Sequence, residues 1–214
     1  MRTKVIALDS SKHPQAMKTR RRTFILAAIG TVTDTFAMGQ AFARTTPVID
    51  DLGREAPAAS IGTFWQLFTD RVMGGVSAGT MSREFVDGRL AIRMRGDVRL
   101  ENNGGFIQMA LDLSPDSGVL DASAWRGIEL DLYGADQEYG MHLRTADLTR
   151  PWQSYRQSFR ALPEWQTIRL PFSGFSPYRT EVQLDLRRLR RLGLVAIGRA
   201  FSADLAVGGL RFFD

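Results

Sequence analysis

The sequence contains no cysteine and only two histidines. The absence of cysteine excludes disulfides, thiolate metal sites and a cysteine nucleophile. Because His13 lies near the N-terminus, a zinc site built on several histidines is excluded from the rest of the chain, and a Ser-His-Asp triad would depend on His142 alone. A Gly-x-Ser-x-Gly elbow and a phosphate-binding loop are also missing. We therefore expect no catalytic residues, no cofactor and no metal.

Positive charge is in excess only at one end of the chain. Seven of the 28 basic and two of the 23 acidic residues precede Arg44, so this segment carries the whole net charge of +5. The high sequence pI of about 10.1 thus describes the first segment and not the neutral remainder. Because binding to nucleic acid is driven by a basic domain surface, we expect no nucleic-acid partner.

Residues 1–43 have the order of an export signal. A basic stretch, KTRRR, precedes an apolar run, TFILAAIGTV, and the small-residue site AFA predicts cleavage after Ala43. Arg21, Arg22 and Phe24 match the twin-arginine pattern and predict a periplasmic or exported protein. The apolar run is shorter than the ~20 residues of a spanning helix, so no membrane span is expected after cleavage.

Two features of this leader stay open. An Arg-rich, acid-poor leader is also typical of a mitochondrial transit peptide, which is the alternative location. Met1 and Met17 are both candidate starts, and a leader that is not cleaved would act as an anchor.

The rest of the chain divides into a predicted linker over 44–60 and one domain over 61–214. The linker mixes Pro, Gly, Ala and acidic residues without an apolar period. The domain alternates apolar and polar residues in at least seven short stretches, such as GRLAIRMRG and RGIELDLYG, which predicts an all-β sandwich or jelly roll. One short helical turn is expected at Asp185–Arg191, followed by a strand from Leu192.

Two glycine-rich loops are candidate binding sites. They are the stretches DRVMGGVS, residues 70–77, and NNGGF, residues 102–106. Each places consecutive glycines beside Asp, Asn or Ser, which indicates either a turn with unusual backbone angles or a close approach to a ligand. The residues concerned are Asp70, Met73, Gly74, Gly75, Ser77, Asn102 and Asn103.

A predicted hairpin, EYGMHLRT followed by WQSYRQSF, is the other candidate surface. Strand alternation places one set of side chains in the core, namely Tyr139, Met141, Leu143, Tyr155 and Phe159. The opposite face then carries His142, Arg144, Trp152, Ser154 and Arg156. An aromatic ring beside a guanidinium suits a protein partner or a sugar, or is simply an Arg-Trp stack that covers the sheet.

Several strings of this sequence, taken in order, resemble one known family. WQLFTDRVMGGVSAG, LENNGGF, WRGIELDLYG, WQTIRLPFSGF and the VGGLRFF ending are similar to complex I intermediate-associated protein 30. The resemblance implies a galactose-binding-like jelly roll without catalytic machinery. It also implies a chaperone-like role in assembling the membrane arm of NADH:ubiquinone oxidoreductase, with respiratory complex subunits as protein partners.

Two function classes follow from these observations. The first is a non-enzymatic, protein-binding domain, for which Asp70, Met73, Asn102, Asn103, Arg144 and Trp152 are expected to cluster at one end or on one face. The alternative is an exported carbohydrate-binding module. In that module Trp152 or Tyr155 would stack on a sugar, and Asp70, Asn102 and Arg144 would bind its hydroxyl groups.

Overall fold

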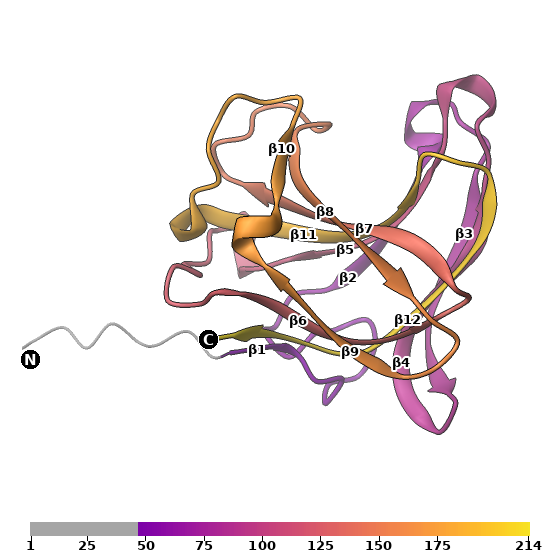
Figure 1. The fold of residues 1–214 in the computed structure, drawn as a ribbon, viewed down its shortest axis with the longest axis horizontal. Helices are drawn as coiled ribbons and strands as arrows, with labels where there is room; N and C mark the ends of the chain where they lie inside the picture. The colour runs from indigo at the N-terminus through magenta and orange to yellow at the C-terminus, as the bar shows by residue number, and fades with distance from the viewer. Residues whose placement is uncertain (1–46) are drawn as a thin grey trace, which may run out of the picture. The chain divides into compact units, whose positions relative to one another are not determined.

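The structure is a computed structural model that describes residues 47–214 (Figure 1). The predicted leader, with Arg21, Arg22, Phe24 and Ala43, lies outside the described residues. Within residues 47–214 no helix is long and apolar enough to cross a membrane.

Two antiparallel sheets of six strands each form the described part of the chain, which confirms the predicted all-β sandwich. The first sheet has the order β3 (Ala78–Val86), β4 (Arg89–Val98), β12 (Phe201–Phe213), β6 (Gly127–Gly134) and β9 (Gln166–Pro171), and β1 (Val48–Asp50) pairs with β12. The second sheet has the order β10 (Ser176–Tyr178), β8 (Ser154–Ala161), β7 (Gln137–Thr145), β11 (Leu189–Ile197), β5 (Phe106–Asp112) and β2 (Trp65–Thr69).

Short 3-10 helices lie in the connections of residues 47–214. They are η1 (Asp70–Met73), η2 (Glu101–Asn103), η3 (Pro115–Ser117), η4 (Phe172–Gly174) and η5 (Leu186–Arg188). The expected helical turn near Asp185 is η5, but the strand that follows begins at Leu189, three residues earlier than predicted.

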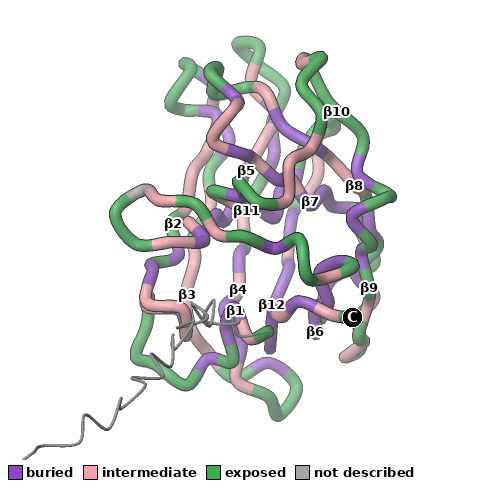
Figure 2. The backbone as a smooth tube through the Cα atoms, turned by 90° about the vertical axis from the view of Figure 1, so that its left-hand side faces the viewer, coloured by how far each residue is buried: buried purple, intermediate pink, exposed green. Residues whose placement is uncertain are grey.

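The core lies between the two sheets and follows the alternation of the strands. Figure 2 shows buried segments alternating with partly exposed ones along the strands. On β7, Tyr139, Met141 and Leu143 are buried, while His142 and Arg144 on the other face are partly exposed. The predicted facing of β7 is therefore confirmed, and Tyr155 and Phe159 of β8 are buried as expected, but Ser154, expected on the outward face, is also buried, and its hydroxyl accepts a hydrogen bond from Arg156.

The range predicted as a linker is part of the domain from Val48 onward. β1 pairs with β12, Ile49 is fully buried, and the carboxylate of Asp50 accepts a hydrogen bond of 2.7 Å from the Trp65 indole. Leu52 and Ser60 also donate backbone N–H groups to Asp50. A strand of three residues is too short to show an alternating pattern, so the sequence did not reveal it.

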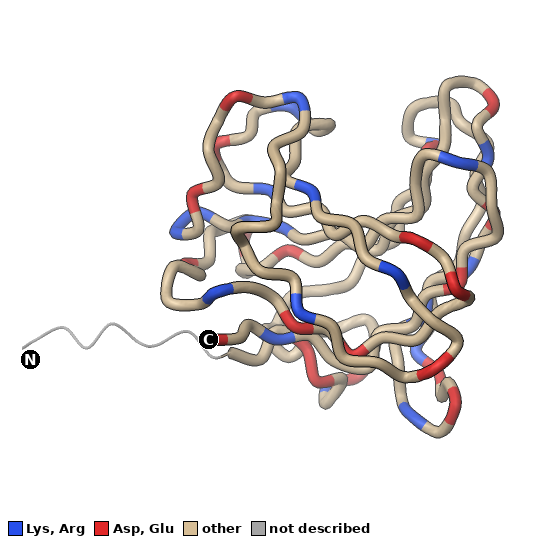
Figure 3. The backbone as a smooth tube through the Cα atoms, in the orientation of Figure 1, with Lys and Arg blue, Asp and Glu red and all other residues tan. Residues whose placement is uncertain are grey.

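The outward face of the first sheet is closed by its own side chains. Val86, Ala91 and Ala206 are buried there beneath Tyr133 and Trp165. Charged residues complete this face in two groups of ion pairs, one of Glu84, Arg93, Arg95 and Asp204 and one of Arg89, Glu129, Asp131, Arg169 and Arg211. In Figure 3 acidic and basic segments lie next to each other along this sheet.

Candidate functional site

The two glycine-rich loops meet at Asp70. Its carboxylate accepts hydrogen bonds from the backbone N–H of Ser77 at 2.9 Å, from the Ser77 hydroxyl at 2.5 Å and from the Gly105 N–H at 2.5 Å. The Ser77 hydroxyl oxygen in turn accepts a hydrogen bond of 2.9 Å from the Arg99 N–H. The loop after β2 is thus joined to the loop before β5, 35 residues further along the chain.

The Asp70 carboxylate occupies space that side chains at Gly75 and Gly104 would fill. A Cβ at Gly75 would lie 2.3 Å from the Asp70 Cγ, and a Cβ at Gly104 would lie 2.4 Å from the Asp70 Oδ2. Real Cβ atoms do not approach other atoms so closely. Gly74, with φ of 88°, takes the left-handed conformation that ends η1.

Asp70 and Ser77 are fully buried, so their polar atoms serve the junction of the two loops. Burial raises the pKa of Asp70, but the hydrogen bonds from Ser77, Gly105 and Phe106 outweigh it and hold the pKa below its ordinary value. We therefore assign these two residues to positioning the loops and not to direct contact with a ligand.

The tips of the joined loops are exposed and partly apolar. Met73 has 64% of its surface exposed, and Val72 and Leu100 are also exposed. Asn102 and Asn103 are exposed in the left-handed conformation, with φ of 58° and 57°. Of the residues predicted here, Met73, Asn102 and Asn103 thus present their side chains to solvent.

Arg144 and Trp152 lie at the opposite end of the second sheet. In the register of the sheet, Arg144 on β7 lies opposite Arg191 on β11, and Arg191 lies opposite Asp112 on β5. Asp112 is at the end of β5 that is farther from the joined loops. The six steps from Phe106 to Asp112 correspond to about 20 Å at ~3.3 Å per residue. The six residues expected to form one cluster are therefore two groups, one at each end of this sheet.

The group around Arg144 includes arginines from two neighbouring strands, β7 and β8. Arg144 donates a hydrogen bond to the Pro151 carbonyl in the loop that carries Trp152, and 52% of the Trp152 surface is exposed. Arg156 on β8 donates its Nε–H to the Ser154 hydroxyl, and its guanidinium lies 3.4 Å from the ring centroid of Tyr178. Burial lowers the pKa of Arg144 and of Arg156, and neighbouring arginines lower both further.

His142 lies in the same face, opposite Arg156 on β8 and Gly193 on β11. Burial and the charge of Arg156 lower its pKa to about 3, so the imidazole is neutral at pH 7. Its Nε2 lies near the Cα of Gly140, where an added Cβ would be 3.0 Å away. Within residues 47–214 no salt bridge joins His142 to a carboxylate, which is the partner that orients a triad histidine.

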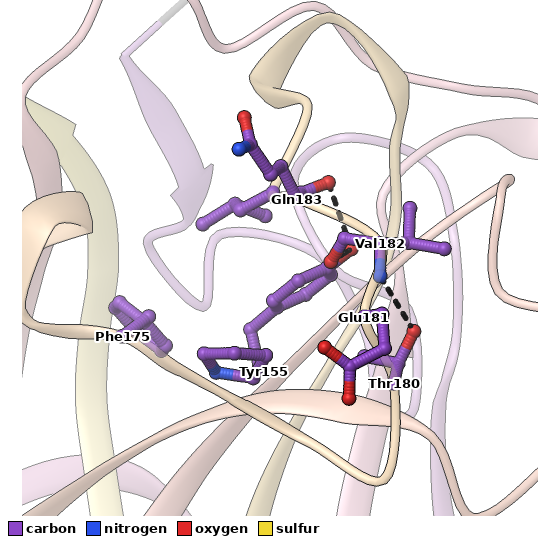
Figure 4. Close-up of a pocket in the computed structure, with 8 residues that line it drawn as sticks. Tyr155, Phe175, Thr180, Glu181, Val182 and Gln183 are labelled. Atoms are coloured by element: carbon purple, nitrogen blue, oxygen red, sulfur yellow. Dashed lines mark hydrogen bonds between the residues drawn. The ribbon is translucent and has the colours of Figure 1, made fainter.

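Tyr155 does not present its ring to solvent. Only 1% of its surface is exposed, and its hydroxyl lies 3.1 Å from the Val182 carbonyl and 3.0 Å from the Gln183 carbonyl (Figure 4). The ring lines a pocket of about 210 Å³ between β10 and the loop over residues 180–184. A stacking platform needs an exposed ring face, so we assign Tyr155 to holding this loop and not to stacking on a sugar.

Two further residues of this face were not selected from the sequence. Arg156 was expected on the outward face, because residues two apart in a strand, such as Ser154 and Arg156, lie on the same face. It was not chosen as a binding residue. Tyr178 lies on β10, a strand of three residues that leaves no periodic signal.

Within residues 47–214, no group of three or more possible metal ligands occurs.

Solved structures with a similar fold include carbohydrate-binding modules. A family 11 module from Clostridium thermocellum, solved with a β-1,3-1,4-mixed-linked tetrasaccharide, matches with a TM-score of 0.61 and 14% identity, over 78% of this chain and 94% of that one. The family 11 module of the cellulosomal cellulase Lic26A-Cel5E of the same organism matches with a TM-score of 0.61 and 15% identity, over 79% and 94%. At this identity the likeness shows the fold alone.

A family 30 carbohydrate-binding module from the cellulosomal cellulase Cel9D-Cel44B of C. thermocellum is more distant. It matches with a TM-score of 0.50 and 13% identity, over 63% of this chain and 82% of that one. A search of curated protein sequences finds no match.

The sequence itself matches one family. The profile of complex I intermediate-associated protein 30 covers residues 56–207, which include both glycine-rich loops and the hairpin of β7 and β8. This match spans more than half of the chain and confirms the resemblance seen in the sequence. The chain belongs to the complex I intermediate-associated protein 30 family.

Proposed function

We propose that this chain is a non-enzymatic, protein-binding domain that acts like a chaperone in the assembly of a respiratory membrane complex. The binding surface is the outward face of the second sheet at the end that carries the group formed by Arg144, Trp152 and Arg156. The observation that carries the proposal is this half-buried group of arginines beside an exposed tryptophan. Tryptophan and arginine are the side chains most enriched at the centres of protein interfaces.

Two further points support a protein partner. The family is named for its association with intermediates of complex I. Exposed Met73, Val72 and Leu100 at the other end of the sheet offer apolar contact area on loops that the Asp70 junction holds in place. A rigid apolar surface binds with a smaller loss of conformational entropy than a flexible one.

Affinity purification of the tagged full chain from solubilised membranes of its host, followed by mass spectrometry, tests this function. We expect recovery of subunits of the membrane arm of NADH:ubiquinone oxidoreductase. Trp152→Ala is expected to reduce that recovery, and Phe85→Ala, which removes an exposed aromatic ring on β3, is the matched control. Failure of the wild-type chain to recover any respiratory subunit would exclude the proposed role.

A carbohydrate-binding module is the second candidate, because the fold matches such modules and because Trp152 is exposed. The geometry favours it less, since Tyr155 is buried and the Tyr178 ring is covered by Arg156. Affinity electrophoresis in gels that contain mixed-linkage β-glucan or other polysaccharides separates the two functions. Retardation of the wild-type chain that Trp152→Ala abolishes would favour the carbohydrate-binding module.

We further propose that residues 1–43 direct export through the twin-arginine pathway and are removed after Ala43. Arg21, Arg22 and Phe24 supply the recognised motif. The mass of the mature protein and its distribution between cell fractions test this, with Arg21→Lys/Arg22→Lys as the variant. Recovery of the wild type with residues 1–43 in the cytoplasm or in mitochondria would exclude export by this route.

A further inference from the structure

The outward face of the second sheet carries positive charge that the described residues do not neutralise. Arg191 is paired with Asp112 and Arg160 with Asp136, at 2.6 Å and 2.7 Å. Within residues 47–214, Arg144 and Arg156 have no carboxylate within salt-bridge distance. Arg144 donates a hydrogen bond to the Pro151 carbonyl, and Arg156 contacts the hydroxyl groups of Ser154 and Tyr178, all of which are uncharged partners.

Arg144 and Arg156 are half-buried guanidinium groups that have lost part of their hydration without gaining a counter-charge. Burial lowers the pKa of each, neighbouring arginines lower it further, and for Arg156 the contact with Tyr178 offsets only part of this effect, so the folded chain disfavours both charges. Buried charges are normally paired, because an unpaired charge loses hydration without a compensating interaction. An anion bound between these groups would supply the missing interaction.

The spacing of the two arginines matches an extended acidic chain. β7 and β8 pair in register through Leu143 and Tyr155, so the next position places Arg144 opposite Ser154. Arg156 is then the diagonal neighbour of Arg144, at about 7–8 Å between such positions. Alternate side chains of an extended segment are separated by ~6.6 Å, so two carboxylates at positions i and i+2 would each reach one guanidinium.

We propose that Arg144 and Arg156 bind two acidic side chains at alternate positions of an extended segment of the protein partner. This inference rests on the proposed protein-binding function and names the chemistry that the partner presents. An acidic peptide fits better than a polysaccharide, because Arg156 already occupies the face of Tyr178 on which a sugar would stack. Guanidinium groups bind carboxylates through charge-assisted hydrogen bonds, so both ends of the contact are chemically matched.

Binding of defined peptides to the purified full chain tests the proposal. The probe is a fluorescent peptide of alternating glutamate and serine, and the control peptide has glutamine in place of glutamate. We expect saturable binding of the glutamate peptide and no binding of the glutamine peptide. Added salt is expected to weaken the binding, because the contact is ionic. Arg144→Gln/Arg156→Gln is expected to weaken binding at least about tenfold, since two charge-assisted hydrogen bonds are lost.

Two controls keep this test decisive. Arg126→Gln removes one exposed charge beside the first sheet and is expected to bind the peptide like the wild type. Arg156→Gln removes one of the two guanidinium groups, is expected to weaken binding of the glutamate peptide, and reports on the site if the double variant fails to fold. Binding of the glutamate peptide that is equal in the wild type and in Arg156→Gln, and equal in the double variant where it folds, would overturn the proposal.

The outcomes of this test and of the membrane purification are independent. Recovery of respiratory subunits without glutamate-peptide binding would leave the proposed function in place and exclude the acidic segment. Tight binding of an oligogalacturonate with no binding of the peptide would also overturn the inference, and would favour an acidic glycan as the ligand of these arginines.

Discussion

The arginines of the first sheet's outward ion-pair groups and the pair Arg144 and Arg156 on the second sheet differ in their partners. On the first sheet Arg93 makes two hydrogen bonds of 2.6 Å to Asp204, and Arg211 contacts both Glu129 and Asp131. On the second sheet Arg144 and Arg156 have uncharged hydrogen-bond partners. Arginines that already form ion pairs within the domain gain little from a further anion. Half-buried arginines without a carboxylate partner can gain charge-assisted hydrogen bonds when a binding partner supplies one.

The same contrast separates the two ends of the second sheet. At one end the carboxylate of Asp70 is fully buried and is bonded to the Ser77 and Gly105 amides. At the other end Trp152 is half exposed beside Arg144. The buried Asp70 junction stabilises the fold at the first end, whereas Arg144 and Trp152 at the second end have little part in the core, so substitutions of Asp70 and of the Arg144 group are expected to affect different properties.

Asp70→Ala is expected to have the largest effect on stability. It leaves the N–H groups of Ser77 and Gly105 without their acceptor inside the protein, and unsatisfied buried groups cost about 1–3 kcal/mol each. We expect the free energy of unfolding in urea to fall by about 3–5 kcal/mol. Glu101→Ala on the exposed η2 is the control, and a loss below about 1 kcal/mol for Asp70→Ala would contradict the assigned role.

Asp204→Ala tests the paired face and is expected to have an intermediate effect. It removes the acceptor of both Arg93 hydrogen bonds and leaves that partly buried guanidinium with Glu84 alone. The expected loss in the free energy of unfolding is about 1–2 kcal/mol, because the pair is bidentate but not fully buried. Asp97→Ala, on the exposed part of β4, is the matched control. Equal stability of Asp204→Ala and wild type would show that the network contributes nothing.

His142→Gln is expected to change the pH dependence of stability. Because the folded pKa of about 3 lies below the ordinary value of 6.5, the unfolded chain takes up a proton that the folded chain does not. The wild type therefore loses stability as the pH falls from about 6.5 toward 3, and His142→Gln lacks this contribution. Melting temperatures at pH 7.5, 6 and 5 measure it, and curves that stay parallel would contradict the burial of a neutral imidazole beside Arg156.

Arg156→Gln is expected to have the smallest effect on stability. It removes a guanidinium whose charge the fold does not neutralise, so the free energy of unfolding changes by less than about 0.5 kcal/mol. Urea denaturation side by side with Asp204→Ala provides the comparison. A loss as large as that of Asp204→Ala would mean that the stack on Tyr178 stabilises the domain, and the contrast between the two faces would fail.

The alternation of side chains predicted the sandwich and the outward position of Arg144, because strand geometry depends on neighbouring residues alone. The same reasoning missed β1 and β10, which have three residues each and whose pairing depends on distant strands. The role of Asp70 was equally hidden, because its hydrogen-bond donors Gly105 and Phe106 lie in a loop that only the folded sandwich brings to it.

The junction of the two loops at Asp70 changes what the most recognisable strings of this sequence mean. DRVMGGVS and NNGGF form one junction of two loops. In it Asp70 binds Ser77 and the Gly105 amide, and Gly75 and Gly104 leave room for the Asp70 carboxylate. A search for relatives that relies on these strings therefore selects chains that can form the same loop junction, and it does not select for a common ligand. Relatives that share a ligand should instead be sorted by the residues at the positions of Arg144, Trp152 and Arg156.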